Sequence, residues 1–178
     1  MRSPTSAHGA MKNYASSSAD TSCGSYGMTN YYMGRNVGML LHGMIWRTTD
    51  IRFWCGLTDQ TGATFGESDS PSGANYAAFR YSTLAGDTNF KCVTSDASGQ
   101  TVEDSGVAAN TNEHAFAIEC DDGSGNIKFY IDGTLVATVT TRRPTTGSDL
   151  CYYLSGMWHS ASRGRLVGLS YVAVQSDL

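Results

Sequence analysis

The feature that most constrains this chain is a two-residue alternation of apolar and polar side chains that recurs along most of its length. Residues two apart lie on the same face of a β-strand, so the alternation predicts strands with one buried face. Turn-forming residues separate these segments, and no segment combines a helical period with start and stop signals. The predicted strands span residues 37–47, 51–57, 75–82, 88–95, 114–120, 126–131, 134–140, 150–157 and 166–174.

The strongest local signal is the Asp132-Gly133 pair between two alternating segments. Such a pair favours the positive φ angles of a type I′ turn and predicts a tight hairpin over residues 127–139. Without helices to make parallel crossovers, the strands are expected to pair antiparallel and close into two stacked sheets. The sequence therefore predicts an all-β, antiparallel two-sheet sandwich.

One predicted strand differs from the others. Residues 37–47 are apolar on both alternating faces, which predicts a strand buried on both sides, with His42 inside.

The length of 178 residues suits a single domain. Residues 1–22 are rich in Ser, Ala and Thr and do not alternate, so we expect an extended N-terminal arm that is flexible or becomes ordered against a partner. Residues 23–178 are expected to form the sandwich.

Charge and hydropathy exclude two classes of partner. The net charge of -4 and the lack of a basic stripe argue against nucleic acid. No apolar run is long enough to cross a bilayer, and the N-terminus lacks the apolar stretch of a signal peptide. We therefore expect no membrane partner and synthesis in the host cytoplasm.

The five cysteines contain no C-x-x-C pair, so the usual zinc signatures are absent. Their odd number and apolar surroundings predict free, buried thiols that act as small hydrophobic side chains. They are Cys23, Cys55, Cys92, Cys120 and Cys151.

Several segments carry a resemblance to known domains. Residues 114–118 with the hairpin 129–136 resemble the back-sheet hairpin of laminin-G and concanavalin A-like lectin/glucanase domains, as do residues 52–59. Residues 76–94 and 101–107 look like jelly-roll domains in structural proteins of tailed phages. The resemblance covers about residues 26–175. It implies a concanavalin A-like jelly roll and a place on a virion.

The same resemblance raises glycoside hydrolysis, which needs two carboxylates across the scissile bond. Glucanases of this fold carry three alternating acids on one strand. Here Glu119 and Asp121 are two apart, but the third acid is missing. Residues 168–172 also fail the last position of the G-x-S-x-G pattern of serine hydrolases. We therefore expect no enzymatic activity and no cofactor.

Contact residues and metal ligands are predicted from local chemistry. Aromatic and arginine side chains suit both glycan and protein contacts, which their composition does not separate. The candidate contact residues are Tyr152, Tyr153, Trp158 and Arg163. A Gly-rich turn offers weak calcium ligands in Asp121, Asp122 and Asn126, but it lacks the EF-hand pattern, so no metal is expected.

These observations lead to two functional hypotheses. The first is a non-enzymatic virion structural protein, a capsid decoration or small fibre or spike subunit that binds identical subunits, capsid or tail proteins. The alternative is a lectin-like carbohydrate-binding module that recognises surface glycans.

Overall fold

The computed structural model describes residues 11–14, 22–27, 31–60, 63–120, 125–159 and 167–177.

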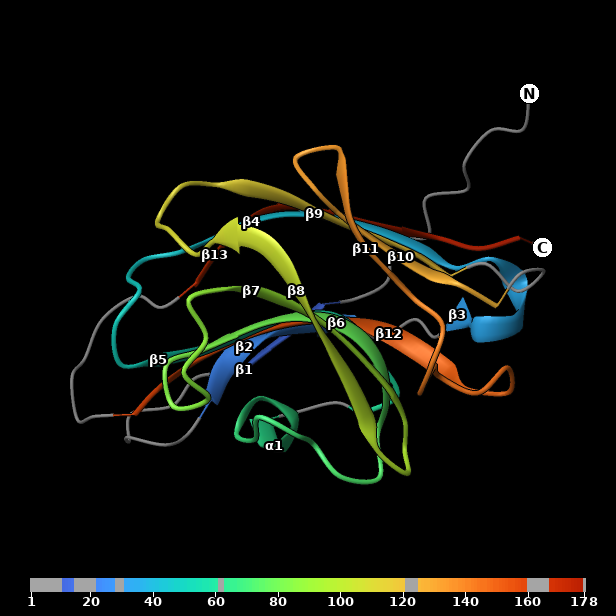
Figure 1. The fold of residues 1–178 in the computed structure, drawn as a ribbon. Coiled ribbons are helices and arrows are strands. Elements are labelled where there is room, and N and C mark those ends of the chain that lie inside the picture. The colour runs from blue at the N-terminus through green and yellow to red at the C-terminus, as the bar shows by residue number, and fades with distance from the viewer. Residues whose placement is uncertain are drawn as a thin grey trace.

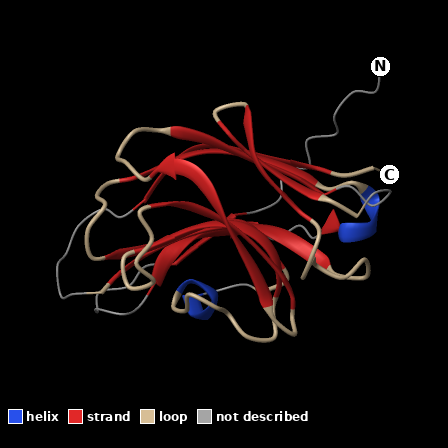
Figure 2. Ribbon diagram, viewed as in Figure 1, coloured by secondary structure: helices blue, strands red, loops and turns tan. Residues whose placement is uncertain are grey.

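Two antiparallel sheets stack face to face (Figures 1 and 2). The larger sheet runs in the order β1 (Met11–Tyr14), β2 (Ser22–Gly27), β12 (Asp149–Trp158), β5 (Ile51–Thr58), β6 (Asn75–Ser82), β7 (Asn89–Asp96) and β8 (Gln100–Ala108), and the short β3 (Tyr31–Tyr32) also pairs with β12. The smaller sheet runs in the order β11 (Thr134–Val139), β10 (Ile127–Ile131), β9 (His114–Cys120), β4 (Gly38–Ile45) and β13 (Val167–Gln175). The prediction of an all-β antiparallel sandwich is confirmed.

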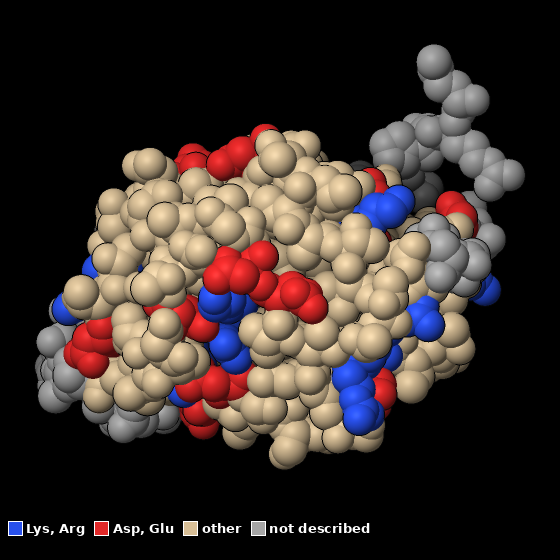
Figure 3. All heavy atoms as spheres, viewed as in Figure 1, with Lys and Arg blue, Asp and Glu red and all other residues tan. Residues whose placement is uncertain are grey.

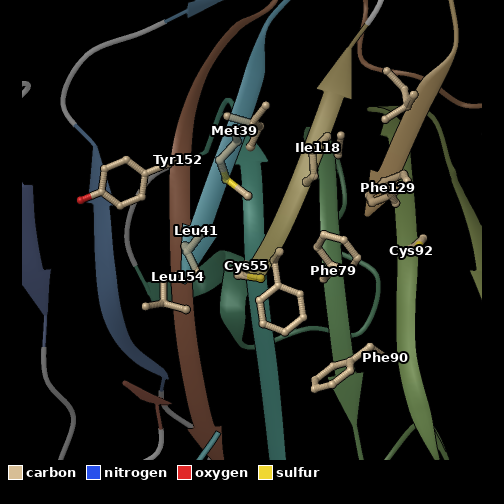
Figure 4. Close-up of a cluster of buried hydrophobic side chains, with 14 of the residues drawn as sticks. Met39, Leu41, Cys55, Phe79, Phe90, Cys92, Ile118, Phe129, Tyr152 and Leu154 are labelled. Atoms are coloured by element: carbon tan, nitrogen blue, oxygen red, sulfur yellow. The ribbon is translucent and has the colours of Figure 1, made fainter. Parts of the chain in front are cut away.

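The core lies between the two sheets and is formed by the inward face of every central strand (Figure 4). Phe79 of β6 contacts Phe116 of β9 and Phe129 of β10 across the two layers, at ring-centroid distances of 5.0 and 5.2 Å. The rings of Phe79 and Phe129 meet edge-to-face, and such packing adds to the free energy gained from burying the rings. These contacts fix the two sheets relative to each other.

The predicted hairpin is confirmed in detail. Asp132 and Gly133 have φ angles of 52° and 79° between β10 and β11. The N–H of Asp132 donates to the carbonyl of Ala115, and the N–H of Ala115 donates to the Asp132 carboxylate, both at 2.9 Å. The turn is therefore tied to the start of β9.

The alternation failed to indicate several elements. Strand β8 lies at the edge of the larger sheet with mostly exposed side chains, so it has no buried face to produce a pattern. A four-residue helix, α1 (Ala63–Gly66), and a 3₁₀ turn, η1 (Met33–Arg35), are too short to show a helical period. Strand β1 lies within the predicted arm and pairs with β2, so the sandwich includes residues that we assigned to the arm. Ser22, the last residue of the predicted arm, begins β2, and the other residues of the arm lie outside the described ones.

The prediction that residues 37–47 are buried on both sides is wrong. Buried and half-buried residues alternate along β4: Leu41 and Ile45 face the core, whereas His42 and Met44 face outward. Trp46, just after the strand, is 47% exposed. The outer face of β4 is apolar although no described element packs on it.

Four cysteines are free and buried, as predicted: Cys55, Cys92, Cys120 and Cys151. The side chain of Cys23 lies outside the described part of the chain. Burial raises the pKa of Cys92 and Cys120 to about 12 and that of Cys151 to about 11. Among the described residues no helix has the length and hydropathy to span a bilayer.

Candidate functional site

The outer face of the larger sheet is covered at its centre by the segment that contains α1. The ring of Phe65 packs on Trp54, Tyr76 and Tyr153, with centroid distances of 5.3, 5.2 and 4.8 Å. All four rings are fully buried. Figure 1 places α1 on the side of this sheet that faces away from the smaller sheet.

Polar groups fasten the same segment to the sheet. Arg52 makes a two-point contact with the Asp69 carboxylate at 2.5 and 3.0 Å, and Arg80 donates to the Asp69 carbonyl at 2.8 Å. The indole N–H of Trp54 donates to the Ser68 carbonyl at 3.0 Å. Partial burial opposes ionisation of Asp69, but hydrogen bonding to Arg52 and Ser82 and the charges of Arg52 and Arg80 outweigh it and lower the pKa of that carboxyl. The centre of this sheet face is closed.

Two of the predicted contact residues are corrected by this arrangement. Tyr152 faces the inter-sheet core, where its hydroxyl lies 3.2 Å from the Ser25 hydroxyl. Tyr153 faces the other way, beneath Phe65. Neighbouring residues of a strand point to opposite faces, and both faces of β12 are covered here, so neither ring is exposed. The Trp158 side chain and Arg163 lie outside the described residues, so their contact role stays a prediction.

The other candidate residues do not assemble into a site. Glu119 faces solvent on β9 and accepts a 2.8 Å hydrogen bond from the Tyr130 hydroxyl. Asp121 and Asp122 are not among the described residues, and Asn126 is half-buried just before β10. In the described ranges, no three His, Cys, Asp or Glu side chains are placed to hold a metal ion.

Two exposed aromatic side chains, Trp46 and Tyr171, lie instead on the outer face of the smaller sheet. Strand β13 pairs with β4, and the register places Tyr171 beside His42 and Gly168 beside Met44. Tyr171 is 52% exposed and its ring meets the His42 imidazole edge-on, with a centroid distance of 5.8 Å. We call this surface the outer ledge; it consists of His42, Met44, Trp46, Glu113, Ser170 and Tyr171.

A glycine sets the shape of the ledge between its two exposed rings. A methyl group at Gly168 would lie 3.0 Å from Cγ of Met44 and 3.5 Å from Nε1 of Trp46. Any larger side chain would therefore displace Met44. The glycine lets the Met44 and Trp46 side chains lie close against β13.

A bulge in β13 supplies the polar part of the ledge. The register shifts between Leu169 and Tyr171, so Ser170 has no partner in the strand ladder. A bulge re-aims the side chain of its extra residue. The Ser170 hydroxyl donates a hydrogen bond to the exposed Glu113 carboxylate, and its oxygen lies 3.4 Å from the His42 carbonyl.

A second acidic group lies beside the ledge. The carboxylate of Asp132 lies 2.7 Å from Nδ1 of His114, whose Nε2 is 3.1 Å from the amide oxygen of Asn110. Partial burial opposes ionisation of Asp132, but the Ala115 N–H and His114 outweigh it and lower its pKa. This end of the smaller sheet therefore carries two carboxylates, and β13 itself has no charged residue. Elsewhere, on the face seen in Figure 3, acidic and basic side chains are intermingled.

The ledge thus combines the exposed aromatic rings with a hydroxyl and an imidazole on the paired strands β4 and β13 and with the carboxylate of Glu113, which precedes β9. The sequence did not predict the ledge, because the outward residues of β4 are of the types found in cores. The residues around Ser170 also contain no pattern that indicates a bulge. The one available signal was that both faces of residues 37–47 are apolar. That pattern indicates either full burial or an exposed contact surface.

No protein-family model matches the chain, and no curated protein matches it. Solved structures do match over most of its length. The β-glucanase of Bacillus licheniformis is 14% identical with a TM-score of 0.60, covering 96% of this chain and 94% of its own. The carbohydrate recognition domain of Emp47p is 9% identical with a TM-score of 0.63, covering 95% and 88%. The laminarinase catalytic domain of Thermotoga maritima is 14% identical with a TM-score of 0.58, covering 88% and 69%.

These likenesses overturn one expectation and leave another untested. The fold is one of enzymes, a glucanase and a laminarinase among them, so the prediction that the chain is not an enzyme is corrected. None of these comparisons tests whether the chain is part of a virion, so that expectation stays a prediction. At these identities the likeness concerns the fold: the chain has the concanavalin A-like jelly-roll fold that glucanases and lectin carbohydrate-recognition domains share.

Proposed function

We propose that the chain is a carbohydrate-binding protein whose outer ledge recognises a glycan. The observation that carries the proposal is the exposed Tyr171 ring beside the hydrogen-bonding groups of Ser170, Glu113 and His42. The structural likeness to carbohydrate-recognition domains supports the same class of ligand.

The chemistry of the ledge suits a sugar. One face of a pyranose carries mainly C–H groups and packs on an aromatic ring, while its hydroxyls donate and accept hydrogen bonds. Tyr171 offers the ring, the carboxylate of Glu113 accepts, and the imidazole of His42 does either. The paired strands β4 and β13 hold His42 and Tyr171, and the hydrogen bond from Ser170 holds Glu113, so little conformational entropy is lost on binding.

The extent of the ledge favours an oligosaccharide over a single sugar. Trp46 lies four positions after His42, which contacts Tyr171. At the usual rise of a strand this is about 13 Å. The Met44 side chain lies between them and is apolar. A ligand that contacts both rings must span the whole ledge.

A panel of immobilised glycans tests the proposal. The wild type is compared with Tyr171→Ala, and Tyr32→Ala serves as the matched control because Tyr32 is 51% exposed on β3 of the other sheet. We expect Tyr171→Ala to weaken binding at least about tenfold, since a central aromatic contact contributes more than 1.4 kcal/mol. Tyr32→Ala should bind like the wild type. Equal binding by all three proteins, or a change only in oligomeric state, would contradict the proposal.

We further propose that this recognition serves a virion surface component of a tailed phage. The support is the resemblance of residues 76–94 and 101–107 to phage structural domains. The N-terminal residues would then attach the domain to identical subunits or to capsid or tail proteins. Mass spectrometry of purified particles should detect the chain in stoichiometric amounts. Its absence from particles whose host cells contain it would overturn this assignment.

A further inference from the structure

We infer that the outer ledge selects glycans that carry a protonated amino group and disfavours glycans that carry acid groups. This inference rests on the proposed function and adds the ligand class. The inference depends on Glu113, whose exposed carboxylate accepts a hydrogen bond from Ser170, the residue that precedes Tyr171 in β13.

Among the residues that the structure describes, the charges around the ledge are unbalanced. Glu113 and Asp132 are the acidic groups at the Tyr171 end. The imidazoles there are His42 and His114, and His114 lies against Asp132 and Asn110. Arg47 lies at the other end, where its guanidinium donates to the Thr49 hydroxyl at 2.9 Å. Because β13 contributes no charge, a cationic ligand near Tyr171 meets attraction and an anionic one meets repulsion.

Two contacts would recognise the amine. An ammonium group over the Tyr171 ring is attracted by its π electrons, and the same group within reach of Glu113 forms a charge-assisted hydrogen bond. An acidic sugar in that place would put two carboxylates together. Both effects act in the same direction, so a single substitution of Glu113 should reduce the discrimination without removing the sugar-stacking surface.

The test compares three oligosaccharides of equal length: a glucosamine oligomer, its fully N-acetylated form and a polyuronate. Affinities are measured for the wild type, Glu113→Gln and a control, Glu119→Gln, which removes a second exposed glutamate of the same sheet. The wild type should bind the amino form more tightly than the acetylated form by about fivefold, as for one exposed charge pair. Glu113→Gln should reduce that ratio toward one, and Glu119→Gln should keep it. Salt at molar concentration screens the charges and should also bring the ratio of the two affinities toward one.

The outcomes separate the inference from the function on which it rests. Tyr171-dependent binding with equal affinity for all three oligosaccharides, or with a preference for the polyuronate, overturns the selectivity and leaves glycan recognition standing. The selectivity is also overturned if a lysine-rich peptide competes for the ledge as well as the glucosamine oligomer does, because the ledge would then bind the cation without recognising the sugar. Failure of every glycan to bind contradicts both.

Discussion

The backbone N–H of Gly66 donates a 3.1 Å hydrogen bond to the hydroxyl of Tyr153, across 87 residues of sequence. This contact joins α1 to the middle of the larger sheet, where Phe65 closes an aromatic cluster. Together, the hydrogen bond and the aromatic cluster close the centre of the outer face of the larger sheet.

The first prediction concerns this bond. Tyr153→Phe keeps the ring but leaves a buried N–H without its acceptor, which should lower the free energy of unfolding by about 1–3 kcal/mol. Urea unfolding measures the loss, and hydrogen exchange should become faster at Gly66. The control is Tyr32→Phe on an exposed ring, where no change is expected. Unchanged stability and exchange in Tyr153→Phe would show that the bond contributes nothing.

The second prediction concerns a buried ion pair on the same sheet face. Arg80 and Asp87 are each less than 10% exposed and contact each other at 3.0 and 3.1 Å. Asp87→Ala leaves the buried guanidinium without the carboxylate that contacts it and should cost about 3–5 kcal/mol of unfolding free energy. Asp96→Ala, which removes the half-buried partner of the exposed Arg142, should cost far less. Equal losses in urea unfolding would refute this ranking.

The third prediction is the direction of the acid response. A hydrogen bond from Lys91 lowers the pKa of Asp104 to about 2, and one from Ser98 does the same for Asp96. In the unfolded chain an aspartate titrates near pH 3.9. The stabilisation is therefore complete above about pH 4 and is lost as the pH falls toward 2.

Urea midpoints at successive pH values measure this loss. Asp104→Asn should show a smaller drop between about pH 5 and pH 2.5 than the wild type, because it has one fewer carboxylate to protonate. A wild-type midpoint that stays constant or rises in acid would be incompatible with these lowered pKa values.

The fourth prediction concerns the thiols. Burial raises the pKa values of Cys55, Cys92, Cys120 and Cys151, so almost no thiolate is present at neutral pH. In a Cys23→Ser variant the native protein should react with no thiol reagent until it unfolds, and should then react at four sites. Non-reducing mass analysis should find no disulfide. Rapid labelling of the folded variant would contradict the described packing.

The sequence was sufficient to predict the sheet architecture because alternation and turn chemistry are local. The Asp132-Gly133 turn and the boundaries of β9 follow from residues within a few positions of one another. The contact of Phe65 with Tyr153 joins distant segments, and no local pattern places two such rings together. The prediction that Tyr153 is exposed failed for this reason.

The candidate site was less predictable still. Alternation reports which residues share a face but not whether another element packs on that face, so Met44 and His42 were assigned to the core. The ledge also depends on the bulge that turns Ser170 toward Glu113, and small shifts of strand register leave no mark in composition. Only the unusual apolar character of both faces of β4 pointed toward a contact surface.

The most direct test of the account locates the bound glycan on the molecule. A ¹⁵N-labelled chain is titrated with the glycan that binds most tightly on the panel, and amide shift changes are mapped residue by residue. We expect the largest changes at His42, Met44, Gly168, Ser170 and Tyr171, on β4 and β13 of the smaller sheet. Changes confined to the larger sheet, with the amides of β4 and β13 unmoved, would contradict the assignment of the outer ledge as the binding site.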